Sequence, residues 1–514
     1  MHQLRVLCCQ LPRGRDQHPG GYLAHRPVGI PGVSPAKARA GSGGWIGTCT
    51  FKEDTTMEKK PISEQIAELA VHLRFEDLPA PVVRHATNLV LDLLGSMIGS
   101  KRIESSRIAA ELSLELGGPE ESTVIGYRRK VAAPNAAFAN AVQSYAFDFA
   151  DDHNESNAHP SVATIPVSLA LGEKLRASGR EVLVAIALGN EVVCRLGAAF
   201  LGKMYYQGFH PTSTCGTFGA AVSASRLLQL DVRHTVWSLG IAGSQAAGLM
   251  AWNTAGSYTK RLQAGHPAWS GMVSALLAQK GFDGPPEIIE GTDGFLQAYS
   301  FNRQYDASRI TEGLGKIWTF ATSSIKVYPC CRYSGGHLDA CLDIYARYRP
   351  DPAKIRRVLI RSSDYTIRLL AGPRKRDPQT VVDAQFSMPW QAAIALIDGR
   401  IDLDTFTEEN LYRPDVRALM PRVEWVCDEE FERRYPEHYS CAVTVTMEDG
   451  QEYTSVVDDP KGDYRNPVTQ EELEAKFMAL ARREIRDEGR IREIAQTVAH
   501  LAELDDISRL FALL

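Results

Sequence analysis

The chain has 514 residues, of which 44% are hydrophobic and 23% charged, and its net charge is -5 at pH 7. This length exceeds what one small core needs, so we expect two domains in an ordinary globular protein. The slightly negative charge gives no general basic field, which argues against nucleic acid or an anionic membrane as a partner. An anionic substrate would need a local basic pocket.

The ten cysteines are scattered along the chain and include no CxxC pair. Their spacing therefore indicates neither a zinc ribbon nor a thioredoxin-like site. We expect a reduced, cytoplasmic protein whose thiols serve as small buried apolar groups. No apolar run approaches the roughly 20 residues that a membrane-spanning helix needs, so no membrane partner is expected.

Residues 1–56 are rich in Gly, Pro and Arg and show no apolar period, which predicts disorder. Two other interpretations stay open. The Arg-bearing, acid-poor segment could be a transit peptide, which would place a eukaryotic protein in mitochondria. Alternatively, Met57 is the true start and the segment is a spurious extension.

Helical patterns begin after Met57 and dominate to about residue 280. Ile62, Ile66 and Leu73 fall on one face of the first expected helix. Residues 82–99 are apolar on most sides, so this second helix should be buried. We assign residues 57–317 to a large helical domain.

The pattern changes near residue 318. Residues 356–363 and 438–457 are rich in β-branched side chains and alternate, and Asp449-Gly450 lies within the second run, which predicts a hairpin. Residues 388–399 read as a helix. We therefore predict a smaller α+β domain over 318–462. Residues 463–514 should form charged helices that return to the helical domain, which makes the fold mostly α.

The segment 148–166 holds the densest group of chemically active side chains. Asp148, Asp151, Asp152 and His153 stand just ahead of His159, and an apolar helical pattern follows. Carboxylates and imidazoles at the mouth of a buried helix are suited to proton transfer. The alternative is that such residues only cap helices, as Asp often does.

Two further clusters open apolar helices. His210 stands with Thr212 and other hydroxyl residues at a glycine-containing helix start, which could bind an anion. The simpler interpretation is a capping turn. Lys260 and Arg261 open a helix that looks buried, which favours carboxylate binding over a solvated charge pair.

The fourth cluster, residues 325–333, lies at the expected junction between the domains, where ligand pockets are common. It contains Cys330, Cys331, Arg332 and Tyr333. Adjacent cysteines form no ordinary disulfide without strain, and no partner for a nucleophilic thiol is visible in the sequence. The chain shows neither a dinucleotide-binding glycine pattern nor a convincing set of metal ligands.

In this order and spacing, the clusters resemble the MmgE/PrpD family, which includes 2-methylcitrate dehydratases and cis-aconitate decarboxylases. The matching segments are FDFADDHNESNAHPS, GFHPTSTCGTFGAA, TKRLQAGHPAWSGMVSALLAQKGF, IKVYPCCRY and DAQFSMPW. The resemblance runs from about residue 60 to the C-terminus. It implies a homodimeric lyase of two domains, with the α+β domain as a lid, the active site between the domains, and no cofactor or metal.

Transferred residue by residue, the resemblance places His159, His210 and Lys260 on the family's active-site histidines and lysine. Asp148 is the best match to the family's upstream catalytic Asp, with Asp151 or Asp152 as alternatives. Cys331 stands where the animal-type decarboxylases carry a His, which weakens a transfer of their activity.

We therefore predict a cofactor-independent lyase for a small di- or tricarboxylic acid, with 2-methylcitrate dehydration as the first choice. The expected catalytic set is Asp148, His159, His210 and Lys260. The expected substrate-binding set is Asp152, Thr212, Arg261, Cys331, Arg332 and Tyr333. Decarboxylation of cis-aconitate and epimerisation of a carboxylic acid remain alternatives. A non-catalytic helical binding protein is the alternative from another class, and catalytic side chains scattered rather than gathered in one cleft would favour it.

Overall fold

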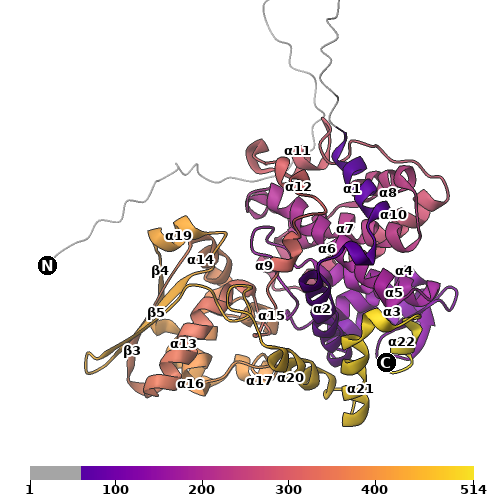
Figure 1. The fold of residues 1–514 in the computed structure, drawn as a ribbon. Helices are drawn as coiled ribbons and strands as arrows, with labels where there is room; N and C mark the ends of the chain where they lie inside the picture. Colours follow the sequence, from indigo (N-terminus) through magenta and orange to yellow (C-terminus); the bar gives the residue numbers. More distant parts are fainter. Residues whose placement is uncertain (1–59) are drawn as a thin grey trace, which may run out of the picture. The chain divides into compact units, whose positions relative to one another are not determined.

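The computed structural model describes residues 60–514. The expectations for residues 1–56 fall outside these described residues. The described fold is mostly helical, with a few strands gathered in a small sheet (Figure 1). This confirms the predicted fold class.

A large hydrophobic core is built mainly by helices between residues 62 and 311. These are α1 (Ile62–His72), α2 (Ala80–Gly99), α3 (Glu104–Leu116), α4 (Ala133–Ser144), α5 (Ser161–Leu175), α6 (Gly179–Ala199), α7 (Pro211–Leu227), α8 (Val232–Gln245), α10 (Thr259–Gln279), α11 (Phe295–Tyr299) and α12 (Ser308–Thr311). The short helix α9 (Ala251–Ala255) lies between α8 and α10 in sequence, and its Trp252 belongs to a second core. Helix α2 is fully buried from residue 89 to its end, as expected. Helix α10 packs on α7 and α4, and α7 packs on α5 and α6.

Helices α6 and α7 approach so closely that glycine is required at their crossing. A Cβ atom on Gly219 would lie 2.7 Å from the backbone oxygen of Gly189, and one on Gly189 would lie 2.9 Å from that of Gly219. Helix α6 is long and apolar enough to span a membrane by composition alone, but its most apolar window is fully buried within the fold. It is therefore a core helix of the described part of the chain.

The helical part also contains a small two-stranded sheet that the sequence did not predict. Strand β1 (Ser122–Val124) pairs antiparallel with β2 (Arg129–Val131). Side chains from α4 and α5 stabilise this hairpin by hydrogen bonds. Asn140 accepts from the backbone N–H of Ile125 and donates to the backbone oxygen of Thr123. The Glu173 carboxylate accepts from the backbone N–H and the hydroxyl of Thr123. These partners lie far away in sequence, so local patterns give no sign of them.

A second hydrophobic core belongs to the α+β part and draws mainly on residues 330–447. Its helices are α13 (Gly335–Tyr348), α14 (Asp364–Leu370), α15 (Val381–Ala384), α16 (Met388–Asp398), α17 (Glu408–Leu411), α18 (Pro414–Leu419) and α19 (Glu429–Arg434). Its strands are β3 (Ile355–Ser362), β4 (Val423–Cys427), β5 (Cys441–Met447) and β6 (Glu452–Val457). The strand order is β4-β3-β5-β6, and only the β3–β4 pair is parallel. The hairpin predicted around Gly450 is confirmed by the antiparallel pair β5–β6.

The end of the chain returns to the first core. Helices α20 (Gln470–Ala481), α21 (Glu488–Ala499) and α22 (Ser508–Phe511) follow the sheet. Both α20 and α21 pack on α2, and Leu473, Phe477 and Ile491 join the first core. In Figure 1 helices α20 and α21, in dark to bright yellow, lie beside the indigo α2. The return of the chain therefore places α20 next to the elements that carry the candidate site.

Candidate active site

Most of the side chains singled out from the sequence meet in one small cavity. Its lining comprises Asp148, Asp152, His159, Tyr205, His210, Met250, Trp252, Lys260, Cys331, Arg332, Tyr333, Leu369 and Phe386. The cavity measures about 20 Å³, which is room for about one water molecule. All four residues of the expected catalytic set are in this lining, so they converge rather than scatter.

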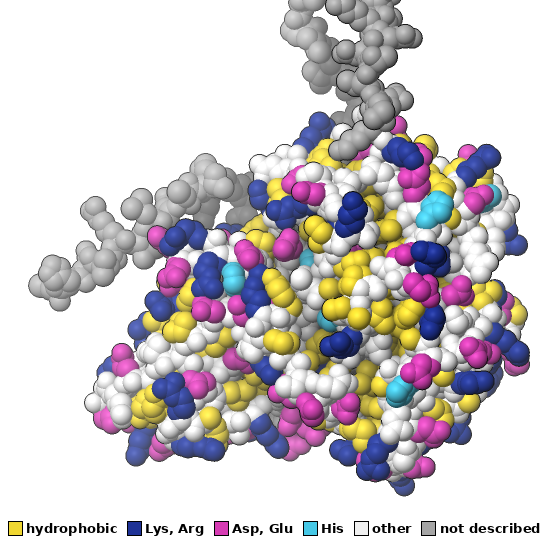
Figure 2. Space-filling model, in the orientation of Figure 1, with side chains coloured by type: hydrophobic (Ala, Val, Ile, Leu, Met, Phe, Trp, Pro, Cys, Tyr) yellow, Lys and Arg dark blue, Asp and Glu magenta, His cyan; other side chains and the backbone are white. Residues whose placement is uncertain are grey.

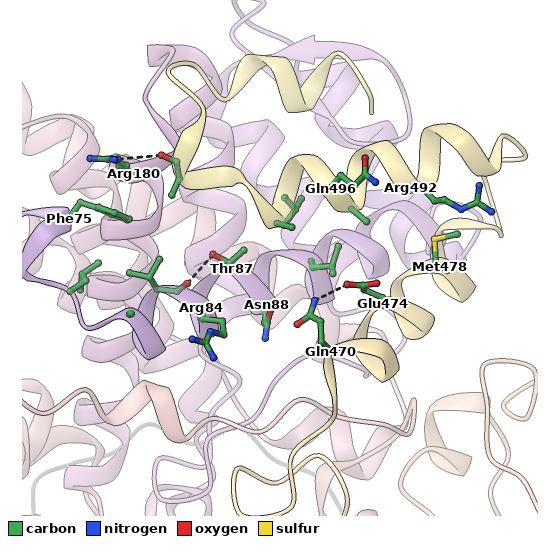
Figure 3. A pocket seen from close by; sticks show the side chains of 18 of the residues that line it. Phe75, Arg84, Thr87, Asn88, Arg180, Gln470, Glu474, Met478, Arg492 and Gln496 are labelled. Carbon is green, nitrogen blue, oxygen red and sulfur yellow. Dashed lines mark hydrogen bonds between the residues drawn. The ribbon is translucent and has the colours of Figure 1, made fainter.

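A much larger cavity of about 900 Å³ lies elsewhere, between α2, α20 and α21 (Figure 3). Apolar side chains are also gathered near the centre of the molecular face shown in Figure 2. The charged and amide side chains Arg84, Glu474 and Gln496 around the cavity in Figure 3 come from three different helices and are exposed. Its lining, taken from the described residues, contains no imidazole. The small cavity is therefore the candidate site for proton transfer.

Asp148 is the electrostatic centre of the small cavity. It follows α4 in the left-handed backbone region, with φ of 57°, which Asp tolerates better than most residues. Its Oδ1 accepts from the Lys260 ammonium at 2.7 Å and from the Lys326 ammonium at 2.8 Å. Burial alone would raise the pKa of Asp148, but Lys260 and Lys326 together hold it well below its usual range. One carboxylate therefore joins two buried cations.

Lys260 lies in the first turn of α10, with its side chain almost fully buried. Its ammonium lies 4.0 Å from the centre of the Tyr145 ring, on which it makes a cation–π contact. Burial lowers the pKa of Lys260 to about 8, with Lys326 acting in the same direction and Asp148 opposing it. The charge of Lys260 is therefore sensitive to pH just above neutrality.

His159 stands just before α5 and presents one nitrogen for chemistry. Its Nδ1 lies 2.6 Å from the backbone oxygen of Asp151, so this nitrogen carries the proton, and Asp152 Oδ1 is 3.5 Å from the same atom. The lone pair then belongs to Nε2. Burial, reinforced by Lys326 and Lys260, lowers the pKa of His159 well below its usual range. The ring is therefore neutral in the empty site.

His210, the N-cap of α7, is held in the same tautomer. Gln263 donates through its amide nitrogen to the backbone oxygen of Leu249, which turns Gln263 Oε1 toward His210 Nδ1 at 2.5 Å. His210 Nδ1 must therefore donate, and Nε2 keeps the lone pair. Burial and the charge of Lys260 lower the pKa of His210 to about 3. The ring centres of His159 and His210 are 6.5 Å apart.

The geometry separates the three aspartates that the sequence left as alternatives. Asp152 lines the cavity beside His159, its Oδ2 has no hydrogen-bond partner among the described residues, and burial raises its pKa to about 6. Asp151 lies behind the cavity, where Ser161 Oγ donates to it at 2.9 Å, and burial raises its pKa to about 8. Asp151 thus supports His159 through its backbone, while Asp148 and Asp152 face the cavity.

We predict that Asp151→Asn raises the melting temperature more at pH 8 than at pH 4.5. The amide keeps an acceptor for Ser161 but cannot ionise. Because the folded pKa of about 8 exceeds the unfolded value of about 3.9, the wild-type protein loses stability as pH rises between these values, by on the order of a few kcal/mol. Thermal unfolding of both proteins at the two pH values measures this difference.

Asp148→Asn is the matched control, since it removes a carboxylate held by two ammonium groups. It should lower the melting temperature at pH 8, opposite in sign to Asp151→Asn. An equal gain for Asp151→Asn at both pH values would show that Asp151 does not ionise with a raised pKa.

The remaining predicted binding residues divide into two groups. Cys331, Arg332 and Tyr333 line the cavity, with Arg332 also donating to Asp463 at 2.8 Å. The other two support it from outside. Thr212 Oγ1 accepts from the backbone of His159 at 3.1 Å, and Arg261 donates to the backbone oxygen of Ala146 and to a glutamine side chain.

Cys331 is a neutral thiol, because burial raises its pKa to about 12. The described cysteines are buried except Cys427, which is exposed, so the expectation of buried thiols is wrong at that position. Among residues 60–514, no three His, Cys, Asp or Glu side chains stand where they could hold a metal ion.

Sequence reasoning missed several residues of the site. Lys326 lies in the fourth cluster, but a single lysine in an irregular segment gives no spacing signal. Tyr205, Met250, Trp252 and Leu369 line the cavity and lie outside the recognised segments, whereas Phe386 lies within the segment DAQFSMPW but was not singled out. Tyr205 donates to the backbone of Asn157 at 2.8 Å, and the Asn157 amide donates to Tyr333 at 3.1 Å. This chain of bonds joins the helical part to the α+β part at the cavity.

Comparison with known proteins gives consistent matches along the chain. The model of the MmgE/PrpD N-terminal domain matches residues 64–308, and that of the C-terminal domain matches residues 328–500. A cis-aconitate decarboxylase of Aspergillus terreus is 29% identical over 474 residues, covering 89% of this chain and 96% of the relative. The cis-aconitate decarboxylase of Homo sapiens is 29% identical over 466 residues, covering 89% and 95%. The cis-aconitate decarboxylase-like protein oryM of Aspergillus oryzae is 28% identical over 481 residues, covering 90% and 98%.

Proposed function

The chain belongs to the MmgE/PrpD family, and from this premise we propose that it is a carboxy-lyase that decarboxylates cis-aconitate or a closely similar tricarboxylate. The relatives support a lyase, and their names favour decarboxylation over the 2-methylcitrate dehydration that the sequence put first. The observation that carries the proposal is the pair of buried ammonium groups on Asp148, next to two neutral imidazoles.

The cations of the site suit a substrate with several carboxylates. Lys260 and Lys326 share the carboxylate of Asp148, and Lys260 and Arg332 line the cavity. Buried ammonium groups act in a medium of low effective dielectric, so their attraction for anions is stronger than in water. Two of the substrate's carboxylates can be held in this way while the third faces the less polar wall formed by Trp252 and Phe386.

The reaction needs one bond broken and one proton delivered. The carbon–carbon bond to one carboxylate breaks, CO₂ leaves, and the bonding pair spreads into the neighbouring double bond and carboxylate. The cations stabilise this charge. A proton from an imidazolium then forms the new carbon–hydrogen bond. Burial and the neighbouring cations keep His159 and His210 neutral, so the negative charge of the bound substrate must favour the protonation of one of them.

The direct test is proton NMR of the purified protein in deuterated water with cis-aconitate, 2-methylcitrate, citrate and a chiral dicarboxylate. The proposal expects itaconate carrying one solvent-derived deuterium on carbon. A new vinylic signal from 2-methylcitrate would instead establish a dehydratase. Deuterium uptake without net conversion would indicate an epimerase, and no change in any sample would favour a binding protein.

A hydro-lyase is the second candidate, and Asp152 is the observation that favours it. Asp152 lines the cavity, one of its oxygens has no hydrogen-bond partner among the described residues, and its pKa of about 6 lets it carry a proton near neutrality. A protonated carboxyl group beside a neutral imidazole could protonate a leaving hydroxide while the imidazole removes a proton from carbon. Cys331, at the position where the animal-type decarboxylases carry a His, supports the same alternative.

We expect kcat/KM to fall more steeply with pH above about pH 8 than near neutral pH. The pKa of Lys260 is about 8, and only its charged form, present below that pH, attracts a substrate carboxylate. Beyond this pKa the loss of the Lys260 charge should add up to a further tenfold fall per pH unit to the fall that the low pKa of the proton-donating imidazole already causes. Initial rates at subsaturating cis-aconitate across pH 6–10 measure this alkaline limb, with thermal melts at each pH as the control for unfolding. An unchanged slope through pH 9.5 would contradict the assignment of Lys260.

A further inference from the structure

A buried ion pair lies behind the candidate site. The Lys476 ammonium on α20 is 2.5 Å from Asp92 Oδ1 on α2, and the two side chains are 9% and 0% exposed. The same ammonium is 3.7 Å from the centre of the Phe149 ring. Neither residue lines the cavity that holds Lys260 and His159. A charge pair this deep needs further hydrogen bonds to be stable.

Those further bonds lead to the site. Lys476 Nζ donates to the backbone oxygen of Phe149 at 2.8 Å and to that of Lys326 at 2.8 Å. Phe149 directly follows Asp148, and the Lys326 side chain is the one that binds Asp148. One ammonium therefore holds both backbone segments that bring the Asp148 carboxylate and the Lys326 ammonium together.

From these contacts we infer that Lys476 is a positioning residue of the active site, which sets the Asp148–Lys326 contact from the C-terminal helix α20. Asp92 in turn orients Lys476. The inference extends the site of the proposed function and depends on that function only for its kinetic readout.

The position of Lys476 on α20 explains why its positioning role could not be predicted from the sequence. Gln470, Glu474 and Met478 point toward the large cavity in Figure 3. Successive residues of an α-helix turn by about 100°, so Lys476 is rotated by about 200° from both Glu474 and Met478. It therefore faces the opposite way, toward Phe149 and Lys326. In a helix with several charged residues, the sequence does not show that the lysine faces inward.

The test is Lys476→Met, which keeps the length of the side chain and removes the donor. We expect a crystal structure of the variant to show the Asp148–Lys326 contact lengthened beyond hydrogen-bond distance. In kinetics we expect kcat to fall about 10- to 100-fold, the loss typical of a slightly misplaced group, while KM changes less than about threefold.

The pH profile gives a readout that a merely structural role would not move. The charge of Lys326 lowers the pKa of Lys260. If Lys326 moves away, that pKa rises, and the alkaline limb of kcat/KM shifts to higher pH. Lys461→Met is the matched control, because it removes an exposed ion pair with Glu472 at the start of the same helix. Lys461→Met should leave kcat and the alkaline limb of the kcat/KM profile unchanged.

Removing Lys476 alone leaves Asp92 buried without its cation, which could prevent folding. The double variant Asp92→Leu/Lys476→Met removes both charges and should fold while showing the same displaced Lys326. An unchanged Asp148–Lys326 contact in either variant would overturn the inference. This structural result does not depend on the reaction, so a failed decarboxylase assay and a failed positioning role remain distinguishable.

Discussion

Replacing Lys260 with methionine should lower kcat/KM on cis-aconitate about 100- to 1000-fold, the usual loss when one preorganised charge at a reacting centre is removed. Methionine retains most of the apolar stem that packs near Tyr145 and Trp252. The fold should therefore persist, and Lys326 should remain bound to Asp148. Steady-state kinetics together with thermal melts would separate lost catalysis from lost folding.

Lys203→Met is the control for this variant. Lys203 bonds a glutamine at the surface and is not part of the cavity lining, so its replacement should leave kcat/KM unchanged. If Lys260→Met kept activity within about threefold of the wild-type protein, Lys260 would have no direct role in binding or turnover.

The second large effect is expected for His159→Asn, with kcat reduced about 100- to 10,000-fold, the usual share of a general acid or base. The asparagine amide can still donate toward the backbone oxygen of Asp151, so the turn before α5 should keep its shape. What disappears is the Nε2 position that gains and delivers the proton. Single-turnover measurements with saturating substrate report this step apart from substrate binding.

His153→Asn provides a close comparison, because His153 is also buried but bonds Ser156 and Thr322 rather than facing the cavity. It should change stability more than kcat. Equal losses of kcat in the two variants would show that the effect at His159 comes from the local fold and not from proton transfer.

Local patterns predicted the regular parts of the fold well. The β5–β6 hairpin follows from alternating β-branched residues around Asp449-Gly450, and α2 follows from a long apolar run. Strand β4 was missed because its parallel partner, β3, lies more than 60 residues earlier and its own side chains are mostly exposed. Pairing over such a distance leaves no local signal.

The residues of the site also divide into those that local patterns indicate and those that only the folded chain brings together. His159, His210 and Lys260 each open a helix within a recognisable segment, so the sequence could indicate them. Arg261 was expected beside Lys260 in the site, but one residue further along α10 turns its side chain by about 100°, toward the backbone oxygen of Ala146. Lys326 could not be found because its significance comes from its distance to Asp148, which only the folded chain defines.

The size of the cavity has a kinetic consequence. A space for about one water cannot contain a tricarboxylate, so under the proposed function the lining of the cavity must move apart to admit the substrate. A movement of the α+β part away from the helical part would break the Asn157–Tyr333 contact. Under the proposed decarboxylation, each catalytic cycle would then include an opening and a closing motion, and the carbanion would form while bulk water is excluded. Turnover by such an enzyme depends on the viscosity of its surroundings whenever that motion is slower than the breaking of the carbon–carbon bond.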